Sequence, residues 1–261
     1  MLKVEDLSLQ FGGVVALRGV SFSIMRGTIS SIIGPNGAGK TTIFNCISRF
    51  VRPDRGRIFF KGHDLRRFRP HQVAMHGIAR TFQNPELFSR MTTLDNLLLG
   101  RHCHIQTGLL GAASHSPETI REELRHRERV ERIIDFLGLQ SVRDQLVANL
   151  PYGTRKLVEL GRALAIEPEL LLLDEPSAGM NAEEKQDLLL WIEDIRDELG
   201  ITILLVEHDM SVVMRISDTV LALNYGEKIA EGLPEEIQQH PEVLRAYLGE
   251  EERTHADRPQ H

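Results

Sequence analysis

The segment from Gly34 to Thr42 has the residue types and the spacing of a phosphate-binding loop. It reads Gly-Pro-Asn-Gly-Ala-Gly-Lys-Thr-Thr and matches the pattern G-x-x-x-x-G-K-[ST]. Glycines let successive backbone N–H groups surround phosphate oxygens. Lys40 would then contact the β- and γ-phosphates of a nucleotide, and the Thr41 hydroxyl would bind Mg²⁺. The alternative is a glycine-rich turn that binds nothing. The predicted loop comprises Gly34, Pro35, Asn36, Gly37, Ala38, Gly39, Lys40, Thr41 and Thr42.

Two adjacent acids, Asp174 and Glu175, follow a run of four leucines. Successive strand residues point to opposite sides of a sheet, so neighbouring carboxylates at a strand end can have different roles. Asp174 would hold Mg²⁺, directly or through water, and Glu175 would polarise the water that attacks a phosphate. A solvent-exposed acidic turn before Pro176 is the alternative interpretation.

The elements around these residues predict an α/β fold with a mostly parallel sheet, because strand-like and helix-like patterns alternate. Ligands of such sheets bind at the carboxyl ends of the strands, where the phosphate loop, Asp174 and His208 would gather. Taken alone, His208 would be an ordinary surface residue, but its position after a strand favours a ligand role. The expected strands are 28–33, 57–61, 78–82, 169–174, 201–206 and 219–223, and the expected helices are 41–50, 181–200 and 211–216.

The helix that follows the acidic pair has a predicted start and a predicted buried face. Asn181 has the character of an N-cap, with Glu184 three residues later. Its apolar residues recur at helical spacing until Gly200. The expected buried face comprises Leu188, Ile192, Ile195 and Leu199.

The first 26 residues read as short strands joined by a turn at Gly12-Gly13. Phe11, just before this turn, offers a flat apolar ring that could stack on adenine. From the residues alone, a core phenylalanine of an antiparallel sheet is the preferred interpretation.

Between residues 84 and 165 the pattern becomes helical, at 92–99 and 117–137, with an intervening loop through Gly108 and Gly111. Arginines and glutamates alternate in the second helix. This favours a solvated face with i,i+4 ion pairs over a nucleic-acid surface. The expected core-facing stripe of this helix is Ile120, Leu124, Ile133 and Leu137. We interpret the region as an inserted helical subdomain.

Composition limits the class of protein. The chain has 261 residues, 41% of them hydrophobic, which suffices for a substantial core. No apolar run approaches the roughly 20 residues of a membrane span, and the first ten residues do not resemble a signal peptide. Cys46 and Cys103 do not indicate a disulfide framework. A net charge of −6 argues against general nucleic-acid binding, and we expect no nucleic-acid partner.

Together these motifs resemble the ATP-binding cassette (ABC) ATPases. The phosphate loop, Gln83, Leu150-Pro151-Tyr152-Gly153, Asp174-Glu175, Ser177-Ala178-Gly179-Met180-Asn181 and Glu207-His208-Asp209 follow the order of that family from about Leu2 to Gly249. The resemblance implies a single cassette domain, with a nucleotide-binding core at 1–83 and 166–249, the helical subdomain at 84–165, and a polar tail at 250–261.

The resemblance also assigns roles that the residues alone leave open. It implies that Phe11 stacks on adenine, that Gln83 contacts Mg²⁺ and the attacking water, and that His208 contacts the γ-phosphate of ATP. It implies that Gly153 belongs to a signature loop that faces the ATP of a second subunit. Here the chain departs from the usual Leu-Ser-Gly-Gly-Gln pattern, because Pro151, Tyr152 and Thr154 replace the serine, the first glycine and the glutamine.

These departures and several further motifs look like the ATPases of branched-chain amino acid importers. The motifs are Phe11 to Leu17, Ala79 to Asn84, Glu175 to Asn181, Val206 to Met210 and Ala246-Tyr247-Leu248-Gly249. The expected protein is a peripheral ATPase on the cytoplasmic face of the inner membrane. Its expected partners are a second ATPase subunit, two membrane-spanning permease subunits and, indirectly, a solute-binding protein.

Four alternatives stay open at this point. They are the ATPase of a related urea or other small-solute importer, the ATPase of an exporter, a soluble cassette ATPase of translation or DNA repair, and a nucleotide-binding protein without turnover.

Overall fold

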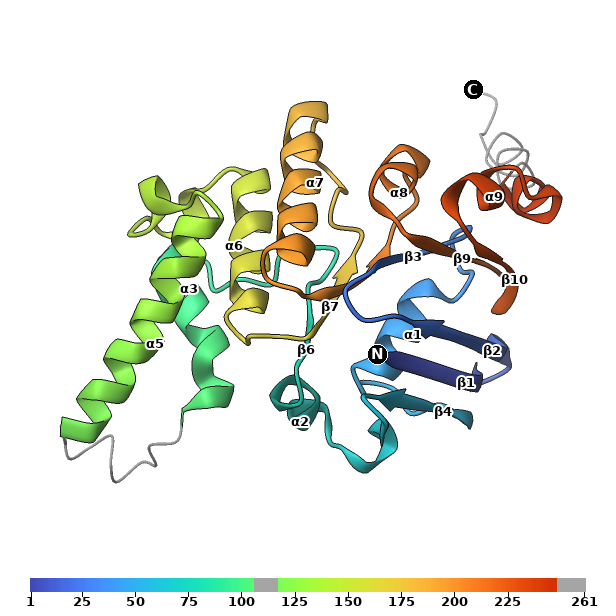
Figure 1. Ribbon diagram of the computed structural model, residues 1–261, viewed down its shortest axis with the longest axis horizontal. Helices are drawn as coiled ribbons and strands as arrows, with labels where there is room; N and C mark the ends of the chain where they lie inside the picture. Colours follow the sequence, from blue (N-terminus) through green and yellow to red (C-terminus); the bar gives the residue numbers. More distant parts are fainter. Residues whose placement is uncertain (106–116, 248–261) are drawn as a thin grey trace.

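The computed structural model describes residues 1–105 and 117–247. Its centre is a six-stranded sheet of order β10-β9-β3-β8-β7-β6, in which every neighbouring pair except β9 and β10 is parallel (Figure 1). Strands β3, β7 and β8 are buried at every position. This is why β7 and β8 read as nearly continuous apolar runs, whereas β3 also buries Ser30 and Ser31, whose hydroxyls hydrogen-bond to Thr219 and Ser217. The strands are β3 (Ile29–Ile33), β6 (Ile78–Arg80), β7 (Leu170–Asp174), β8 (Thr202–Val206), β9 (Thr219–Asn224) and β10 (Glu227–Gly232). The predicted parallel core is confirmed.

A second, antiparallel sheet of order β2-β1-β4-β5 contains the N-terminal strands. The expectation of short strands was wrong, because β1 and β2 have 10 and 11 residues. Strand β1 continues through a local irregularity at Asp6, which has a φ of 47° and lies at a register shift between Val4 and Leu7. The predicted Gly12-Gly13 turn is confirmed. The strands are β1 (Leu2–Phe11), β2 (Val14–Ile24), β4 (Arg55–Phe60) and β5 (His63–Asp64).

Helices cover the sheets. Helix α1 (Lys40–Ile47) packs its buried residues into the core shared with β1, β2 and β4. Helix α7 (Ala182–Asp197) starts at the predicted capping box, in which the Glu184 N–H donates to Asn181 Oδ1 at 2.9 Å. This helix ends before Leu199, which is 47% exposed and does not join the predicted buried face. The other elements are η1 (Leu65–Arg67), α2 (Pro70–Met75), α8 (Met210–Ile216) and α9 (Pro234–Gln238).

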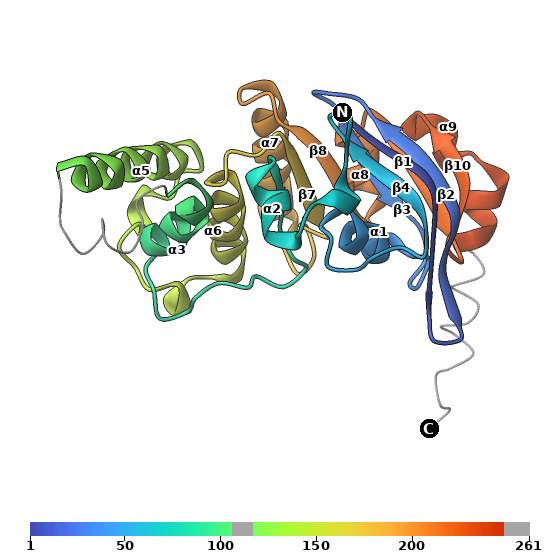
Figure 2. The ribbon, with the colours of Figure 1, turned by 90° about the horizontal axis from the view of Figure 1, so that it is seen from below.

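The helices α3, α5 and α6 gather at one end of the molecule, away from the antiparallel sheet in both views (Figures 1 and 2). Their buried side chains, such as Leu97, Ile134 and Val158, belong to a core that continues under β7 and β8. The elements here are α3 (Thr93–Gly100), η2 (Arg101–His104), α5 (Pro117–Phe136), η3 (Gln140–Val142), η4 (Val147–Asn149) and α6 (Tyr152–Leu164). The inserted helical portion of the predicted fold is therefore present.

The predicted core stripe of α5 was wrong in its first half. Ile120 and Leu124 are 47% and 55% exposed, because the first turns of α5 extend beyond its neighbours (Figure 1). The second half was right, since Leu137 is buried and Ile133 is partly buried against the core. Val130 and Ile134, which were not predicted, are also buried. The loop through Gly108 and Gly111 and the segment 250–261 lie outside the described residues. No helix within the described ranges is both long and apolar enough to cross a membrane.

Candidate active site

The phosphate loop links β3 to α1 and needs glycine for steric reasons. Gly34 has a φ of +149°, and a Cβ there would lie 2.3 Å from the Leu223 carbonyl oxygen. Gly39 has a φ of +101°, and its Cβ would lie 2.7 Å from the Ala16 carbonyl oxygen. The loop is thus pressed between β9 and β2, and only a residue without a side chain fits these two positions.

Lys40 is the first residue of α1 and is only 6% exposed. Its Nζ donates hydrogen bonds to the carbonyl oxygens of Gly34, at 2.6 Å, and Pro35, at 3.0 Å. The ammonium group is therefore folded back over the loop at the positive end of a helix. Thr41, in the same first turn, is exposed, and Thr42 is partly buried.

Gln83, Glu175 and His208 come together from three separate segments. Gln83 Nε2 donates to Glu175 Oε2 at 2.6 Å, and His208 Nδ1 lies 3.7 Å from the same oxygen. Glu175 has a φ of +47°, so its backbone turns sharply after β7, and its N–H donates to the Val206 carbonyl oxygen. A residue whose backbone is held in this rare conformation next to a polar cluster is typical of functional sites.

Asp174, at the end of β7, forms a buried ion pair that sequence analysis did not anticipate. Arg80 Nη2 donates to Asp174 Oδ2 at 2.7 Å, and the two side chains are 7% and 6% exposed. Arg80 Nη1 also donates to Asn45 Oδ1 of α1, and its guanidinium lies 5.0 Å from the centre of the Phe82 ring. Arg80 thus joins the acidic strand end to the phosphate-loop helix and to the segment that carries Gln83.

Phe11 lies at the end of β1 and is 50% exposed. The core interpretation preferred from the residues alone is therefore wrong. The hairpin that carries Phe11 adjoins the phosphate loop through β2, since the Arg18 N–H donates to the Gly226 carbonyl oxygen, and the Gly226 N–H donates to that of Ala38. Stacking of Phe11 on adenine stays a prediction.

Gly153 lies in the first turn of α6, for which Pro151 is the N-cap residue. A Cβ at Gly153 would lie 2.5 Å from Oε1 at the end of the Glu184 side chain, so the glycine leaves room for this carboxylate. The structure does not bring Gly153 to the phosphate loop of its own chain. The role of Gly153 toward another subunit stays a prediction.

Three side chains of α6 hold the segment that follows β6. Lys156 Nζ donates to the Gln83 carbonyl oxygen, and Glu159 Oε1 accepts from the Phe82 N–H at 3.2 Å. Arg162 Nη1 donates to the Glu86 carbonyl oxygen at 2.7 Å. Burial lowers the pKa of Lys156 and raises that of Glu159, whose side chains lie close enough to offset this effect partly.

The sequence analysis missed Arg80, Lys156, Glu159 and Tyr247 as site residues. Tyr247 Oη accepts a hydrogen bond from the Gly34 N–H at 2.9 Å and so reaches the phosphate loop from the far end of the described chain. Arg80 and Tyr247 stand in motifs that were noticed, but nothing in their spacing indicates a contact.

The predicted magnesium ligands are a hydroxyl, an amide and a carboxylate from Thr41, Gln83 and Asp174. The described residues contain no group of three His, Cys, Asp or Glu side chains that could hold a metal alone. The donor set nevertheless suits Mg²⁺, which prefers oxygen ligands and takes most of them from phosphate and water. Arg80 contacts only Oδ2 of Asp174, so Oδ1 remains for a metal ion. Glu175 accepts from the side-chain nitrogen of Gln83, so the amide oxygen of Gln83 remains as well.

The arrangement combines an anion cradle with a carboxylate positioned by an amide and an imidazole at the same edge of the sheet. Such a site can bind a polyphosphate and activate water against it. The amide, carboxylate and imidazole groups at this edge can bind water and phosphate oxygens, as the transfer of a phosphoryl group to water requires.

Comparisons with known proteins agree with this chemistry. A family model described as "ABC transporter" matches residues 17–178, and one described as "Branched-chain amino acid ATP-binding cassette transporter" matches residues 227–253. The high-affinity branched-chain amino acid transport ATP-binding protein BraF of Pseudomonas aeruginosa is 39% identical over 250 residues, covering 96% of this chain and 98% of the relative. The corresponding LivG protein of Escherichia coli K12 is 40% identical, with the same coverage.

Solved structures give the same result for the fold. A nucleotide-free ATP-binding cassette from an ABC transporter has a TM-score of 0.82 and 34% identity, over 95% of this chain and 98% of the other. An ATP-binding cassette of an ABC transporter in its ADP conformation has a TM-score of 0.83 and 33% identity, with the same coverage.

Proposed function

Because this chain belongs to the ABC transporter family of ATP-binding cassettes, we propose that it is the ATP-hydrolysing subunit of an importer for branched-chain amino acids. The observation that carries the ATPase part is the hydrogen bond between Gln83 and Glu175, with His208 beside it, at the edge of the sheet that bears the phosphate loop. The similarity to the branched-chain amino acid transport ATP-binding proteins BraF and LivG supports the choice of solute.

ATP would bind with its phosphates in the loop from Gly34 to Thr42. The backbone N–H groups and the Lys40 ammonium would neutralise the phosphate charge, and the exposed ring of Phe11 would stack on adenine. Mg²⁺ would be held by the Thr41 hydroxyl, Gln83 and Asp174. When bound, it would neutralise charge on the β- and γ-phosphate oxygens.

Glu175 would act as the general base for hydrolysis. Its carboxylate would accept a proton from the attacking water, while the Gln83 amide would fix the orientation of that carboxylate and of the water. His208, beside the same carboxylate, would donate a hydrogen bond to the γ-phosphate.

The site is completed by a second ATPase subunit in this proposal. The first turn of α6 presents the N–H groups of Tyr152, Gly153 and Thr154 at the positive end of a helix. In a head-to-tail pair these groups would face the γ-phosphate held by the other subunit. The partner would be the same or a similar chain, and closure of the pair would require ATP.

Transport requires that closure moves the membrane subunits. The segment 84–99 would line the groove that docks on the permease, and α6 holds the start of this segment through Lys156, Glu159 and Arg162. Rotation of α6 with the signature loop would therefore displace the permease contact. We place the protein at the cytoplasmic face of the inner membrane, with an external solute-binding protein that delivers the amino acid.

The ATPase part is tested with Glu175→Gln and Lys40→Ala, using a fluorescent ATP analogue and phosphate release. Glu175→Gln should keep ATP binding and lose at least about 100-fold in turnover, since general-base catalysis contributes 10²–10⁴-fold. Lys40→Ala should lose nucleotide affinity. Normal turnover of Glu175→Gln would remove this residue as the base.

The transport part is tested by purifying the chain from solubilised membranes of its host, followed by uptake of labelled leucine, valine and urea. Co-purification with two polytopic membrane proteins and ATP-dependent uptake of leucine and valine are expected. Uptake of urea alone would reassign the solute. Recovery with ribosomes or DNA, and with no membrane protein, would refute the transporter assignment while leaving the ATPase chemistry intact.

A further inference from the structure

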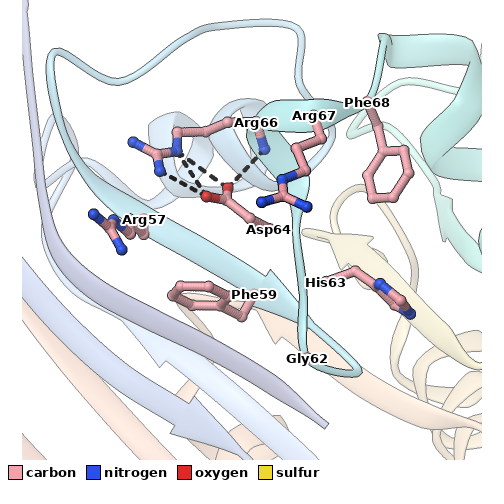
Figure 3. Close-up of a pocket in the computed structure, with 8 residues that line it drawn as sticks. All are labelled: Arg57, Phe59, Gly62, His63, Asp64, Arg66, Arg67 and Phe68. Carbon is pink, nitrogen blue, oxygen red and sulfur yellow. Dashed lines mark hydrogen bonds and ion pairs between the residues drawn. The ribbon is translucent and has the colours of Figure 1, made fainter.

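A concave site on the outer side of the antiparallel sheet has no part in the nucleotide chemistry. We call it the arginine cup (Figure 3), and it encloses a volume of about 580 Å³. Its floor includes the Phe59 ring of β4, whose neighbours Ile58 and Phe60 point the other way into the core that contains α1. The cup is lined by Arg57, Phe59, Gly62, His63, Asp64, Arg66, Arg67 and Phe68.

The charge around the cup is opposite to that of the whole chain. Eight arginine or lysine residues and two aspartates lie between residues 49 and 69, a net charge of +6 in a chain whose net charge is −6. Arg66 is engaged by Asp64, with Nη2 2.6 Å from Oδ2. Within residues 1–105 and 117–247, the side chains of Arg57 and Arg67 form no hydrogen bond and no close ion pair, although the charge of Arg57 helps Arg66 to lower the pKa of Asp64. Two guanidinium groups therefore remain for an anion.

The cup adjoins the surface that we assign to the permease. Arg49, two residues after the end of α1, donates hydrogen bonds to the carbonyl oxygens of Arg66 and Phe68 in the cup wall. The next residue, Phe50, is 61% exposed, and its ring lies 6.3 Å from that of Phe82, beside Gln83. A subunit that presents the region around Gln83 to a permease would thus bring the cup close to the lipid around that permease.

We propose that the arginine cup binds the phosphate group of an anionic phospholipid, with Arg57 and Arg67 as the principal contacts. This inference rests on the proposed function, because it requires the membrane to lie on this side of the molecule. Guanidinium groups form paired hydrogen bonds to phosphate, and the surface of the cytoplasmic leaflet is rich in such groups. The aromatic side chains Phe59 and Phe68 would contact the glycerol portion of the lipid.

The test is co-sedimentation of the full chain, without nucleotide, with vesicles of phosphatidylcholine containing 30% or no phosphatidylglycerol. The parent chain should bind the anionic vesicles, and Arg57→Gln/Arg67→Gln should bind them about tenfold or more weakly, since each basic residue near such a surface contributes roughly fivefold. Arg125→Gln/Arg132→Gln, which removes the same charge from an exposed part of α5, is the matched control and should bind like the parent. Equal losses in both double variants would reduce the effect to net charge and overturn the proposal.

Two further measurements test whether a loss of vesicle binding reflects misfolding and whether the ligand is a lipid or free phosphate. Arg57→Lys/Arg67→Lys keeps the charge and should restore part of the vesicle binding if the substituted cup still folds. Calorimetric titration with inorganic phosphate should show no heat assigned to the cup; binding of phosphate that depends on Arg57 and Arg67, without vesicle binding, would identify a soluble ligand and refute the lipid. ATP hydrolysis should be unchanged in all of these variants. If no permease co-purifies but the parent chain still binds anionic vesicles through Arg57 and Arg67, the transport role is refuted and the lipid site is not.

Discussion

Replacing Arg80 should strongly destabilise the folded chain. Its partner Asp174 is 6% exposed at the side chain, so Arg80→Met would leave a carboxylate buried without its counter-charge. Breaking one partner of a buried pair costs about 3–5 kcal/mol. The loss of the Asn45 hydrogen bond acts in the same direction.

This magnitude converts into a measurable shift of the melting temperature. Unfolding entropy of about 2.1 cal/mol/K per residue gives roughly 0.55 kcal/mol/K for a chain of this length, so Arg80→Met should melt about 5–9 °C below the parent. Differential scanning calorimetry without nucleotide is the assay, since bound ATP would add its own stabilisation. Arg132→Met, on the exposed face of α5, is the control and should change the unfolding free energy by less than about 0.5 kcal/mol.

A second variant tests the mechanism of this loss. Arg80→Met/Asp174→Asn removes the uncompensated charge and should recover a large part of the stability that the single variant loses. A single variant that melts within about 2 °C of the parent, or a double variant no more stable than the single one, would refute the reasoning that the carboxylate is ionised and dependent on Arg80.

Three further predictions concern other contacts. Phe11→Ala should weaken ATP binding about fivefold, as expected for the loss of an aromatic contact of about 1 kcal/mol, whereas Phe11→Trp should keep it; unchanged affinity of Phe11→Ala in a fluorescence titration would argue against stacking. Glu159→Met should speed hydrogen exchange of the Phe82 amide, measured by mass spectrometry, because that amide loses its acceptor; an unchanged rate would mean that α6 does not restrain this segment. Hydrogen bonds from Lys185 and, second, from Ser211 lower the pKa of Asp209 from 3.8 to about 2. The contribution of this carboxylate to stability is therefore present above the ordinary carboxyl value and is lost as the pH falls from 3.8 through 2. Urea titrations should show Lys185→Met less stable than the parent at pH 6, with most of that difference gone at pH 2, and a constant difference at all pH values would contradict the pair.

The sequence predicted those parts of the site that depend on local pattern. The phosphate loop has a fixed spacing, and the apolar strand before Asp174 and Glu175 is continuous because both faces of a parallel strand are buried. These two signals were enough to predict the sheet and the edge at which the polar residues gather.

Contacts between distant segments could not be predicted in this way. The pairing of Arg80 with Asp174 depends on β6 lying next to β7, and no local pattern encodes that neighbourhood. Phe11 looked like a core residue because a strand pattern does not say which end of a hairpin protrudes. Ile120 and Leu124 have helical spacing, but their exposure depends on where the neighbouring helices end.

The hydrogen bond between Tyr247 and Gly34 joins residues that are 213 positions apart in the chain. A change in the position of Tyr247 therefore affects the conformation of the phosphate loop, and a change in the loop affects the position of Tyr247, because coupling of this kind is reciprocal. A fusion or an antibody that pulls Tyr247 from its place beside Val243 and Ile237 would also release the first glycine of the loop. Conversely, a phosphate loop fixed by bound ATP would keep Tyr247 in its place. An antibody that binds only when Tyr247 is displaced would then bind less when the nucleotide site is occupied.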